Sequence, residues 1–337
     1  MLQGHGDNAY LYNRKIVADF SSNVYFKGPS KELILHLQNN ISKIANYPEV
    51  AAESLNKQIA EKLNLSAKNI LVTNGATEAF YLLALLFRKS ASDIFTPSFA
   101  EYADACNLHN HVINYFCNSK LTVYFKSISK LIWICNPNNP DGKILSAESI
   151  GQIINNNKNS YIIIDEAYID FTLRKVSVID KVKHYKNLII VRSLTKKYAI
   201  PGLRLGYIVA PEYVIAELMK IKQPWSVNIM AINAAEFLLN QNNTFFNIEE
   251  LIRLSRLFQN KISEIKGLEP IVSETSYFLI KTKNKASQIT DILAKKYGLL
   301  VRNASNFRGL NDFYIRVATQ CENDNNKLVN ILKQLHE

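Results

Sequence analysis

The sequence contains little glycine, and the glycines that it has are not spread evenly. Only 11 of the 337 residues are glycine, which is about half of the usual ~7%. A chain that avoids glycine keeps it mainly where the backbone conformation requires it. Several of these glycines lie in short segments that also gather Asn, Asp, Lys, Arg and Pro. We therefore search those segments for functional residues.

Cysteine is also scarce, and its spacing matches no metal or redox motif. Among the four cysteines there is no Cys-x-x-Cys pair, and no histidine joins them in a zinc-finger pattern. We expect unpaired thiols in a reducing cytoplasm and no metal site. The sequence lacks a His-Glu-x-x-His run and a Gly-x-Ser-x-Gly elbow, so nothing favours a metalloprotease or an α/β-hydrolase.

No apolar run is long enough to cross a membrane. The longest, Ala79–Phe87, ends at Arg88 and Lys89, whereas a membrane-spanning helix needs about 20 residues. The first ten residues, MLQGHGDNAY, have neither the basic start nor the apolar stretch of a signal peptide. With 47% hydrophobic and 20% charged residues, the composition is typical of a globular protein. We expect a cytoplasmic protein that has no membrane partner.

Acidic residues are outnumbered by basic ones, and the formal net charge is +11. Such an excess is compatible with nucleic-acid binding. However, Lys outnumbers Arg about three to one and the lysines are scattered along the chain. We interpret the charge as a solvated basic surface and predict no nucleic-acid partner. The alternative is a basic rim that attracts an anionic small substrate.

The middle of the chain alternates apolar strands with helical patterns. Glu78–Arg88 and Ser146–Asn155 have the pattern of helices. Seven strands are predicted, at Ile70–Thr73, Asp93–Thr96, Val112–Phe116, Leu131–Cys135, Tyr161–Asp165, Leu188–Arg192 and Gly206–Ala210. Continuous apolar strands between helices indicate an α/β fold with a mostly parallel seven-stranded sheet. Polar residues at the strand ends are expected to meet in one crevice.

The last third has the pattern of a smaller α+β domain. Helices are predicted at Glu249–Ile265, Ala286–Tyr297 and Glu322–Leu335, and strands at Pro270–Thr282, Leu299–Arg302 and Asp312–Ala318. The N-terminal residues are expected to pack with this domain. The predicted division is therefore a large α/β domain at residues 35–225 and a small domain formed by residues 1–34 and 226–337.

A carboxylate and an amine follow two of the predicted strands. Asp165 ends the buried strand of YIIIDEAYID, and Tyr168 follows three residues later. An acid at this position can cap a helix, or it can pair with a cationic ring nitrogen. In RSLTKKYAIPGLRLGY, Lys196 and Lys197 follow another strand. A lysine in a partly desolvated, cation-rich site becomes a nucleophile that can form a Schiff base.

Several other residues in these segments are suited to bind a phosphate or an aromatic ring. Ser193 and Arg204 offer a hydroxyl donor and a guanidinium fork to a phosphate. TNGATE lies between a strand and a helix, where backbone N–H groups make an anion site. Asn139, in NPNNPDG, can reach a ring edge or a substrate carboxylate. Phe99, in TPSFAEY, can lie flat on an aromatic cofactor or belong to the core.

Together these groups describe a site for pyridoxal 5′-phosphate. The motifs and their order resemble the fold-type I aminotransferase superfamily over nearly the whole chain. The resemblance implies a catalytic Schiff-base lysine at Lys196, with Asp165 on the ring nitrogen and Tyr168 and Asn139 at the ring hydroxyl oxygen. It also implies a homodimer. The remaining cofactor-binding residues that it implies are Phe99 on the ring, Ala76, Thr77, Ser193 and Arg204 on the phosphate, and Tyr47 reaching the phosphate from the partner subunit.

Two subfamilies compete, and several segments are more similar to the L-threonine-O-3-phosphate decarboxylases of cobalamin biosynthesis than to the histidinol-phosphate aminotransferases. These segments are SLTKKYAIPGLRLGY, QPWSVN, HGDN and RNASNFRGL. The resemblance implies a small phosphorylated amino-acid substrate, whose phosphate binds His5 and Arg302 and whose carboxylate binds Arg316. It also places Asn23 and Asn139 at the substrate. The expected reaction is decarboxylation to (R)-1-amino-2-propanol O-2-phosphate, and the alternative is transamination with 2-oxoglutarate. An aminotransferase-like sensor domain tied to DNA binding is a third and weaker hypothesis.

Overall fold

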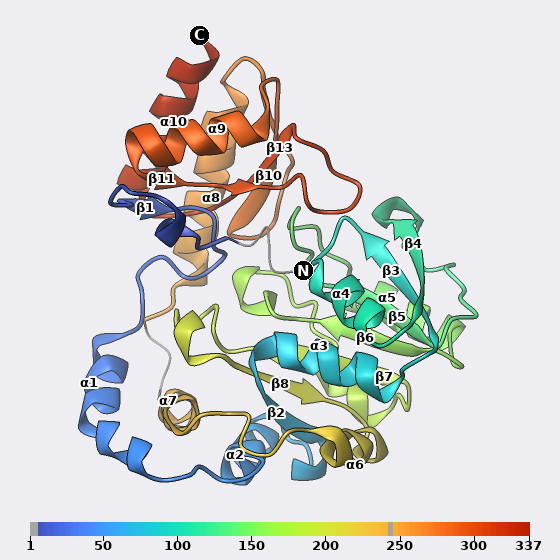
Figure 1. The fold of residues 1–337 in the computed structure, drawn as a ribbon. Coiled ribbons are helices and arrows are strands. Elements are labelled where there is room, and N and C mark those ends of the chain that lie inside the picture. The colour runs from blue at the N-terminus through green and yellow to red at the C-terminus, as the bar shows by residue number, and fades with distance from the viewer. Residues whose placement is uncertain (1–5, 242–244) are drawn as a thin grey trace.

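The computed structural model describes residues 6–241 and 245–337. Figure 1 shows a large part that contains the main sheet and, above it, a smaller part that contains the chain from residue 248 onward. His5, one of the predicted substrate ligands, lies outside the described residues.

The main sheet has the seven predicted strands. Their order across the sheet is β2-β8-β7-β6-β5-β3-β4. All neighbours are parallel except β8, which runs antiparallel to both β2 and β7. The strands are β2 (Ile70–Asn74), β3 (Ala91–Thr96), β4 (Val112–Cys117), β5 (Leu131–Cys135), β6 (Tyr161–Asp165), β7 (Leu188–Ser193) and β8 (Leu205–Val209). The predicted α/β fold with a mostly parallel sheet is confirmed.

Helices cover both faces of this sheet, because successive residues of each strand point to opposite sides. On β6, Ile162 and Ile164 pack with α2 (Glu53–Leu63) and α5 (Ala147–Asn156). Ile163 packs on the other face with α3 and α4. The helices of that face are α3 (Gly75–Leu86), α4 (Glu101–Leu108) and α6 (Glu212–Ile221). Burial on both faces explains why the strands are continuously apolar.

The small domain is built on a four-stranded antiparallel sheet of order β12-β13-β10-β9. Its strands are β9 (Leu268–Pro270), β10 (Tyr277–Thr282), β12 (Arg302–Asn303) and β13 (Tyr314–Ala318), and its helices are α8 (Ile248–Ser263), α9 (Ala286–Ile292) and α10 (Glu322–His336). The N-terminal segment joins it, because β1 (Ala18–Asp19) pairs with β11 (Leu299–Leu300). Phe20 packs in the same core as α8 and α10.

The structure differs from the predicted elements in two places of this domain. The segment Pro270–Thr282, predicted as one strand, begins at the last residue of β9, turns, and forms a strand again only from Tyr277, as β10, which pairs antiparallel with β9. Between them Ser273 and Thr275 bond to each other and to nearby backbone groups, which is the turn chemistry of hydroxyl residues. The helix predicted at Ala286–Tyr297 is α-helical only to Ile292 and continues as a π-helical segment, Leu293–Tyr297.

Residues just after the predicted domain boundary pack with the large domain. Helix α7 (Ile229–Asn240) follows residue 225, and its Ala231, Ile232 and Ala235 belong to the core between the main sheet and α2. On its other side α7 packs against Leu33 of α1 (Lys31–Asn39). The chain therefore leaves the large domain's core only after α7.

Two absences in the described residues bear on function. None of the described helices is long and apolar enough to span a membrane. Within the same residues, no group of His, Cys, Asp and Glu side chains is arranged to hold a metal ion.

Candidate active site

A cavity of about 800 Å³ lies at the carboxyl ends of β2, β6 and β7. The small domain closes one side of it with Arg302 and Arg316. Twelve of the predicted site residues line this cavity: Asn23, Ala76, Thr77, Phe99, Asn139, Asp165, Tyr168, Ser193, Lys196, Arg204, Arg302 and Arg316. Segments that are far apart in the sequence therefore meet where the parallel strands end, as expected for this class of sheet.

Asp165 lies at the end of β6, where both of its carboxylate oxygens are held. Tyr102 donates its hydroxyl to Oδ2 over 2.5 Å, and the backbone N–H of Ala167 donates to Oδ1 over 2.8 Å. Burial raises the pKa of Asp165 to about 6, although these two hydrogen bonds act in the opposite direction. At neutral pH the group is a buried carboxylate that can pair with a cation.

Lys196 and Lys197 have different surroundings. Lys196 lines the cavity, and its Nζ lies 6.0 Å from the centre of the Tyr168 ring. Burial and the charges of Arg204 and Arg316 lower the pKa of Lys196 to about 8. Lys197 instead pairs with Asp170 over 3.1 Å. A lowered pKa makes the amine of Lys196 available as a nucleophile, so the geometry favours the predicted choice of lysine.

A cradle for an anion lies beside Lys196. Helix α3 begins at Gly75, so the N–H groups of its first turn, which includes Ala76 and Thr77, have no partner within the helix. Arg204 reaches this point, because a Cβ at Gly75 would lie 2.6 Å from its Nη2. The Ser193 hydroxyl shares a hydrogen bond with Thr195 over 2.8 Å. A phosphate group here would meet a helix N-terminus, a guanidinium and two hydroxyls.

The opposite side of the cavity carries two buried guanidinium groups. Arg316 donates Nη1 to Asn139 Oδ1 over 2.6 Å and Nη2 to the backbone oxygen of Ser21. Arg302 donates to Asn306 Oδ1 over 2.7 Å. Burial and the charge of Arg316 lower the pKa of Arg302 to about 9. Among the described residues neither arginine forms an ion pair with a carboxylate, so a bound anion would relieve the repulsion between them.

Asn23 and Tyr168 stand between the two arginines and the Asp165 side of the cavity. Burial raises the pKa of Tyr168 to about 12, so its hydroxyl stays protonated and can donate a hydrogen bond. The buried amide of Asn23 lies within reach of the Tyr168 hydroxyl, but neither its oxygen nor its nitrogen has a partner at the ordinary distance and angle of a hydrogen bond within the described residues. Buried polar atoms normally have partners, and these amide atoms line a cavity that can supply one.

Tyr47 does not line the cavity. Its side chain is 85% exposed and packs against Trp225, with the ring centres 5.4 Å apart. The prediction that it reaches a phosphate in the neighbouring subunit therefore stays a prediction.

Sequence reasoning missed Tyr102, whose hydroxyl contacts Asp165. The available signal was an aromatic residue in the first turn of the helix that begins two residues after Phe99, and in the structure the two rings contact each other with their centres 5.9 Å apart. It also missed Thr195 and Ser21, which contact Ser193 and Arg316.

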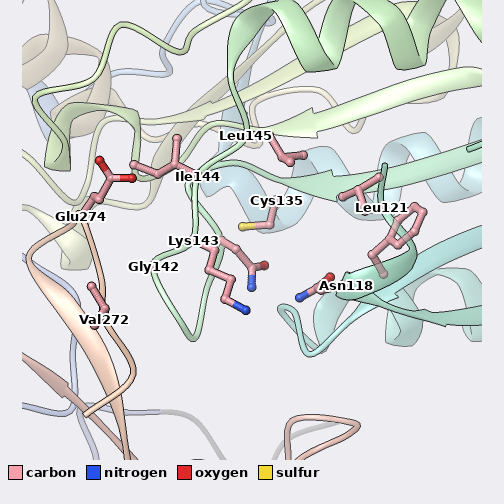
Figure 2. Close-up of a pocket in the computed structure, with 11 residues that line it drawn as sticks. Asn118, Leu121, Cys135, Gly142, Lys143, Ile144, Leu145, Val272 and Glu274 are labelled. Atoms are coloured by element: carbon pink, nitrogen blue, oxygen red, sulfur yellow. The ribbon is translucent and has the colours of Figure 1, made fainter. Parts of the chain in front are cut away.

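A second cavity, of about 290 Å³, lies between the end of β5, the loop that follows it and the β9–β10 turn. Figure 2 shows Cys135 at its centre, with Lys143 and Asn118 nearby and Val272 and Glu274 approaching from the small domain. The Cys135 thiol lines this cavity and lies 3.9 Å from Asp165 Oδ2. One thiol therefore separates the second cavity from the buried carboxylate.

The residues of the large cavity fit pyridoxal 5′-phosphate by their donor set. They combine an amine of lowered pKa, a buried carboxylate for a ring nitrogen, an anion cradle and the half-buried Phe99 ring. Phe99 is held by an edge contact with Phe80, whose ring centre is 6.2 Å away. The unpartnered amide of Asn23 is the kind of orphaned polar group that a bound molecule satisfies.

The fold and the cavity define a pyridoxal 5′-phosphate enzyme of fold type I. Residues 15–333 match the family described as aminotransferase class I and II, and the chain belongs to this family. The predicted family and the predicted cofactor are thereby confirmed.

Comparisons with individual proteins point in two functional directions. The crystal structure of L-threonine-O-3-phosphate decarboxylase from Porphyromonas gingivalis superposes with a TM-score of 0.92 at 35% identity, over 95% of this chain and 99% of that chain. A histidinol-phosphate aminotransferase of Thermoanaerobacter pseudethanolicus is 30% identical over 90% of this chain and 89% of its own length. The histidinol-phosphate aminotransferase of Sinorhizobium meliloti, solved in complex with pyridoxal 5′-phosphate, shares the fold with a TM-score of 0.83 at 18% identity, over 96% of this chain and 92% of its own.

Proposed function

We propose that this enzyme decarboxylates L-threonine O-3-phosphate to (R)-1-amino-2-propanol O-2-phosphate, a step of cobalamin biosynthesis. The observation that carries the proposal is the pair of buried arginines, Arg302 and Arg316, on one side of the cavity. The similarity to the decarboxylase structure from Porphyromonas gingivalis supports it.

Two guanidinium groups in one cavity suit a substrate that carries two anions at the same time. Phosphothreonine has a carboxylate on Cα and a phosphate two bonds further along its side chain. Arg316 is fixed by Asn139 and Ser21, and Arg302 by Asn306, so each can present its remaining donors in a defined direction. Gripping the substrate at two points fixes its rotation about Cα, and rotation decides which Cα bond is broken.

When bound, pyridoxal 5′-phosphate supplies an electron sink for charge that develops at the substrate Cα. Lys196 would anchor its aldehyde, Asp165 would hold a proton on its ring nitrogen, and Tyr168 and Asn139 would bond its ring hydroxyl oxygen. Ala76, Thr77, Ser193 and Arg204 would bind its phosphate. After CO₂ leaves, the amine of Lys196 would return a proton to Cα, because its lowered pKa lets it gain and lose a proton near neutral pH.

Histidinol-phosphate transamination is the second candidate, favoured by the similarity to aminotransferases such as that of Thermoanaerobacter pseudethanolicus. Histidinol phosphate has a phosphate and no carboxylate, so it would use one of the two arginines, whereas the co-substrate 2-oxoglutarate has two carboxylates and could use both. In that reaction Lys196 would remove the proton from Cα instead.

The test is a comparison of the two reactions on one preparation. The enzyme loaded with cofactor is incubated with O-phospho-L-threonine, and both CO₂ and the phosphorylated aminopropanol are measured. A parallel sample receives histidinol phosphate and 2-oxoglutarate, and Lys196→Ala protein is the blank for both. We expect CO₂ release in the first sample alone. Amino transfer in the second sample without CO₂ in the first would assign the enzyme to the aminotransferases.

We also propose that the enzyme is a cytoplasmic homodimer and that Tyr47 completes the phosphate site of the partner subunit. The high exposure of Tyr47 and Trp225 beside each other supports an interface there. Mixing unfolded Tyr47→Ala and Lys196→Ala chains and refolding them together tests this. If Tyr47 acts across the dimer, mixed dimers contain one intact site and regain up to half of the wild-type activity. Mixtures that stay as inactive as either variant would contradict it.

A further inference from the structure

The least expected contact of the active site is the one between Tyr102 and Asp165. Tyr102 comes from the first turn of α4, and its side chain is almost completely buried behind Asp165. Its hydroxyl lies 2.5 Å from Asp165 Oδ2, which is the separation of a charge-assisted hydrogen bond. No role for this residue follows from the cavity lining, because Tyr102 itself does not line the cavity.

The Tyr102 ring is held in place by the aromatic rings that pack against it. It stacks on Trp133, with ring centres 5.5 Å apart and planes 17° apart, and meets the edge of Phe80 at 4.9 Å. The indole N–H of Trp133 in turn donates to Ser92 over 3.4 Å. A ring packed on two sides aims its hydroxyl in a fixed direction, and that direction is the carboxylate of Asp165.

The other donors to Asp165 cannot replace this hydroxyl. The backbone N–H of Ala167 binds the other oxygen, Oδ1. The thiol of Cys135 lies 3.9 Å from Oδ2, and it also lies 3.3 Å from the backbone oxygen of Pro137. A thiol is a weak donor, and Cys135, although it packs in the same core cluster as Tyr102, also lines the second cavity (Figure 2). Tyr102 is therefore the one strong side-chain donor to Asp165 within the described residues.

We propose that Tyr102 is a positioning residue of the active site, whose hydroxyl keeps Asp165 ionised and aligned so that the proton of the pair stays on the ring nitrogen of the cofactor. A carboxylate and a pyridine nitrogen that share a proton have two arrangements, with the proton on one partner or on the other. A hydrogen bond donated to the carboxylate stabilises its charged form, so it favours the proton on nitrogen. This inference rests on the placement of the cofactor's ring nitrogen at Asp165 and is independent of whether the substrate loses CO₂ or an amino group.

The charges around Asp165 agree with this role. Burial raises its pKa, and Tyr102 is the strongest influence that lowers it again. The pKa of Tyr102 is itself raised well above its usual value by burial and by the carboxylate, so the hydroxyl remains a donor at any working pH. The other titratable groups that face Asp165 are Cys135 of β5, Lys196 after β7, and Glu166 and Tyr168, which follow it in the chain.

The test begins with Tyr102→Phe, which keeps the ring and removes the hydroxyl. In protein free of cofactor and labelled with ¹³C at aspartate carboxyl groups, the NMR titration of Asp165 should move upward by about one to two pH units, because one charge-assisted hydrogen bond is lost. Asp165→Asn identifies the resonance. Tyr81→Phe is the matched control, since Tyr81 bonds Glu101 over 3.1 Å and does not touch Asp165. Tyr81→Phe should not change the pH at which Asp165 titrates.

A second measurement uses the loaded enzyme. With ¹⁵N in the ring of the bound pyridoxal 5′-phosphate, the nitrogen resonance of Tyr102→Phe should move toward the unprotonated position, and turnover should fall at least tenfold with little change in KM. Placing 3-fluorotyrosine at position 102 makes the hydroxyl a stronger donor, so Asp165 should titrate lower, and this variant also serves if Tyr102→Phe does not fold. An unchanged Asp165 titration and an unchanged ring nitrogen signal in both variants would refute the role of Tyr102. The Asp165 titration and the ring nitrogen signal are both measured without substrate. They therefore test the role of Tyr102 separately from the proposed decarboxylation.

Discussion

Gly206 offers the sharpest test of how the anion cradle is built. It lies in β8, between Thr73 of β2 and Ser193 of β7. A methyl group at Gly206 would lie 2.6 Å from the backbone nitrogen of Ala76, 2.7 Å from the carbonyl carbon of Gly75 and 2.8 Å from the backbone oxygen of Arg192. All three neighbours are backbone atoms, so no side chain can turn away to make room.

The cost of Gly206→Ala follows from these distances. Ordinary contacts of a Cβ atom begin near 3.4 Å, so the first turn of α3 must retreat by nearly an ångström. Overpacking of this kind destabilises a protein by about 1–3 kcal/mol. The displaced atom is the N–H of Ala76, which we propose as a phosphate ligand. Losing one charge-assisted hydrogen bond of about 1.5–3 kcal/mol weakens cofactor binding roughly 10- to 100-fold.

The matched control is Gly202→Ala, four residues away, where an added methyl group meets nothing within 4 Å. Thermal unfolding is measured with and without pyridoxal 5′-phosphate, and the dissociation constant of the cofactor is obtained by titration of the unloaded protein. We expect that Gly206→Ala, and not Gly202→Ala, lowers the Tm and also reduces the rise in Tm that added cofactor produces. If its cofactor affinity equals that of Gly202→Ala, then the start of α3 does not hold the phosphate.

Three further predictions concern single residues. Lys196→Ala should abolish turnover and the visible absorbance of the covalently held cofactor. Lys197→Ala, which loses its ion pair with Asp170 and its contacts with the Tyr198 and Phe246 rings, should keep that absorbance; the reverse pattern would show that the other lysine binds the cofactor. Arg302→Ala should raise KM for O-phospho-L-threonine roughly 100-fold, because a buried charge partner of the substrate is lost, and should leave the affinity for the cofactor nearly unchanged; equal losses in titrations of both ligands would exclude Arg302 as a substrate residue. Because folding lowers the pKa of Lys196 from 10.5 to about 8, the cofactor-free protein loses stability as the pH falls from about 10.5 to 8. Lys196→Met should therefore raise the free energy of unfolding, measured with urea, by at most about 3 kcal/mol below pH 8. Above pH 10.5 it should leave the free energy of unfolding unchanged. An increase that does not depend on pH would contradict the lowered pKa.

The main sheet was predictable because its strands are buried on both faces. In the strand Tyr161–Asp165 the three central isoleucines are buried on alternate faces of the sheet, and the polar Asp165 marks the place where the strand ends. The turn between β9 and β10 was not predictable in the same way, because the apolar residues on either side of Ser273 and Thr275 are compatible with one long strand. Hydroxyl groups that bond their own backbone divide it into two.

The sequence by itself predicted the family, the cofactor and twelve residues that line the cavity, because many of those residues follow a strand or begin a helix, and the chemistry needed at these positions restricts the residue type. The local pattern does not distinguish the two adjacent lysines, and only the tertiary structure shows how they differ, because Lys196 lines the cavity and Lys197 pairs with Asp170. It also brought Tyr102 of α4 to Asp165 of β6, 63 positions apart. Such contacts depend on how a helix is rotated and shifted against a sheet, and packing of side chains from several elements sets that arrangement, so no local pattern of residues contains it.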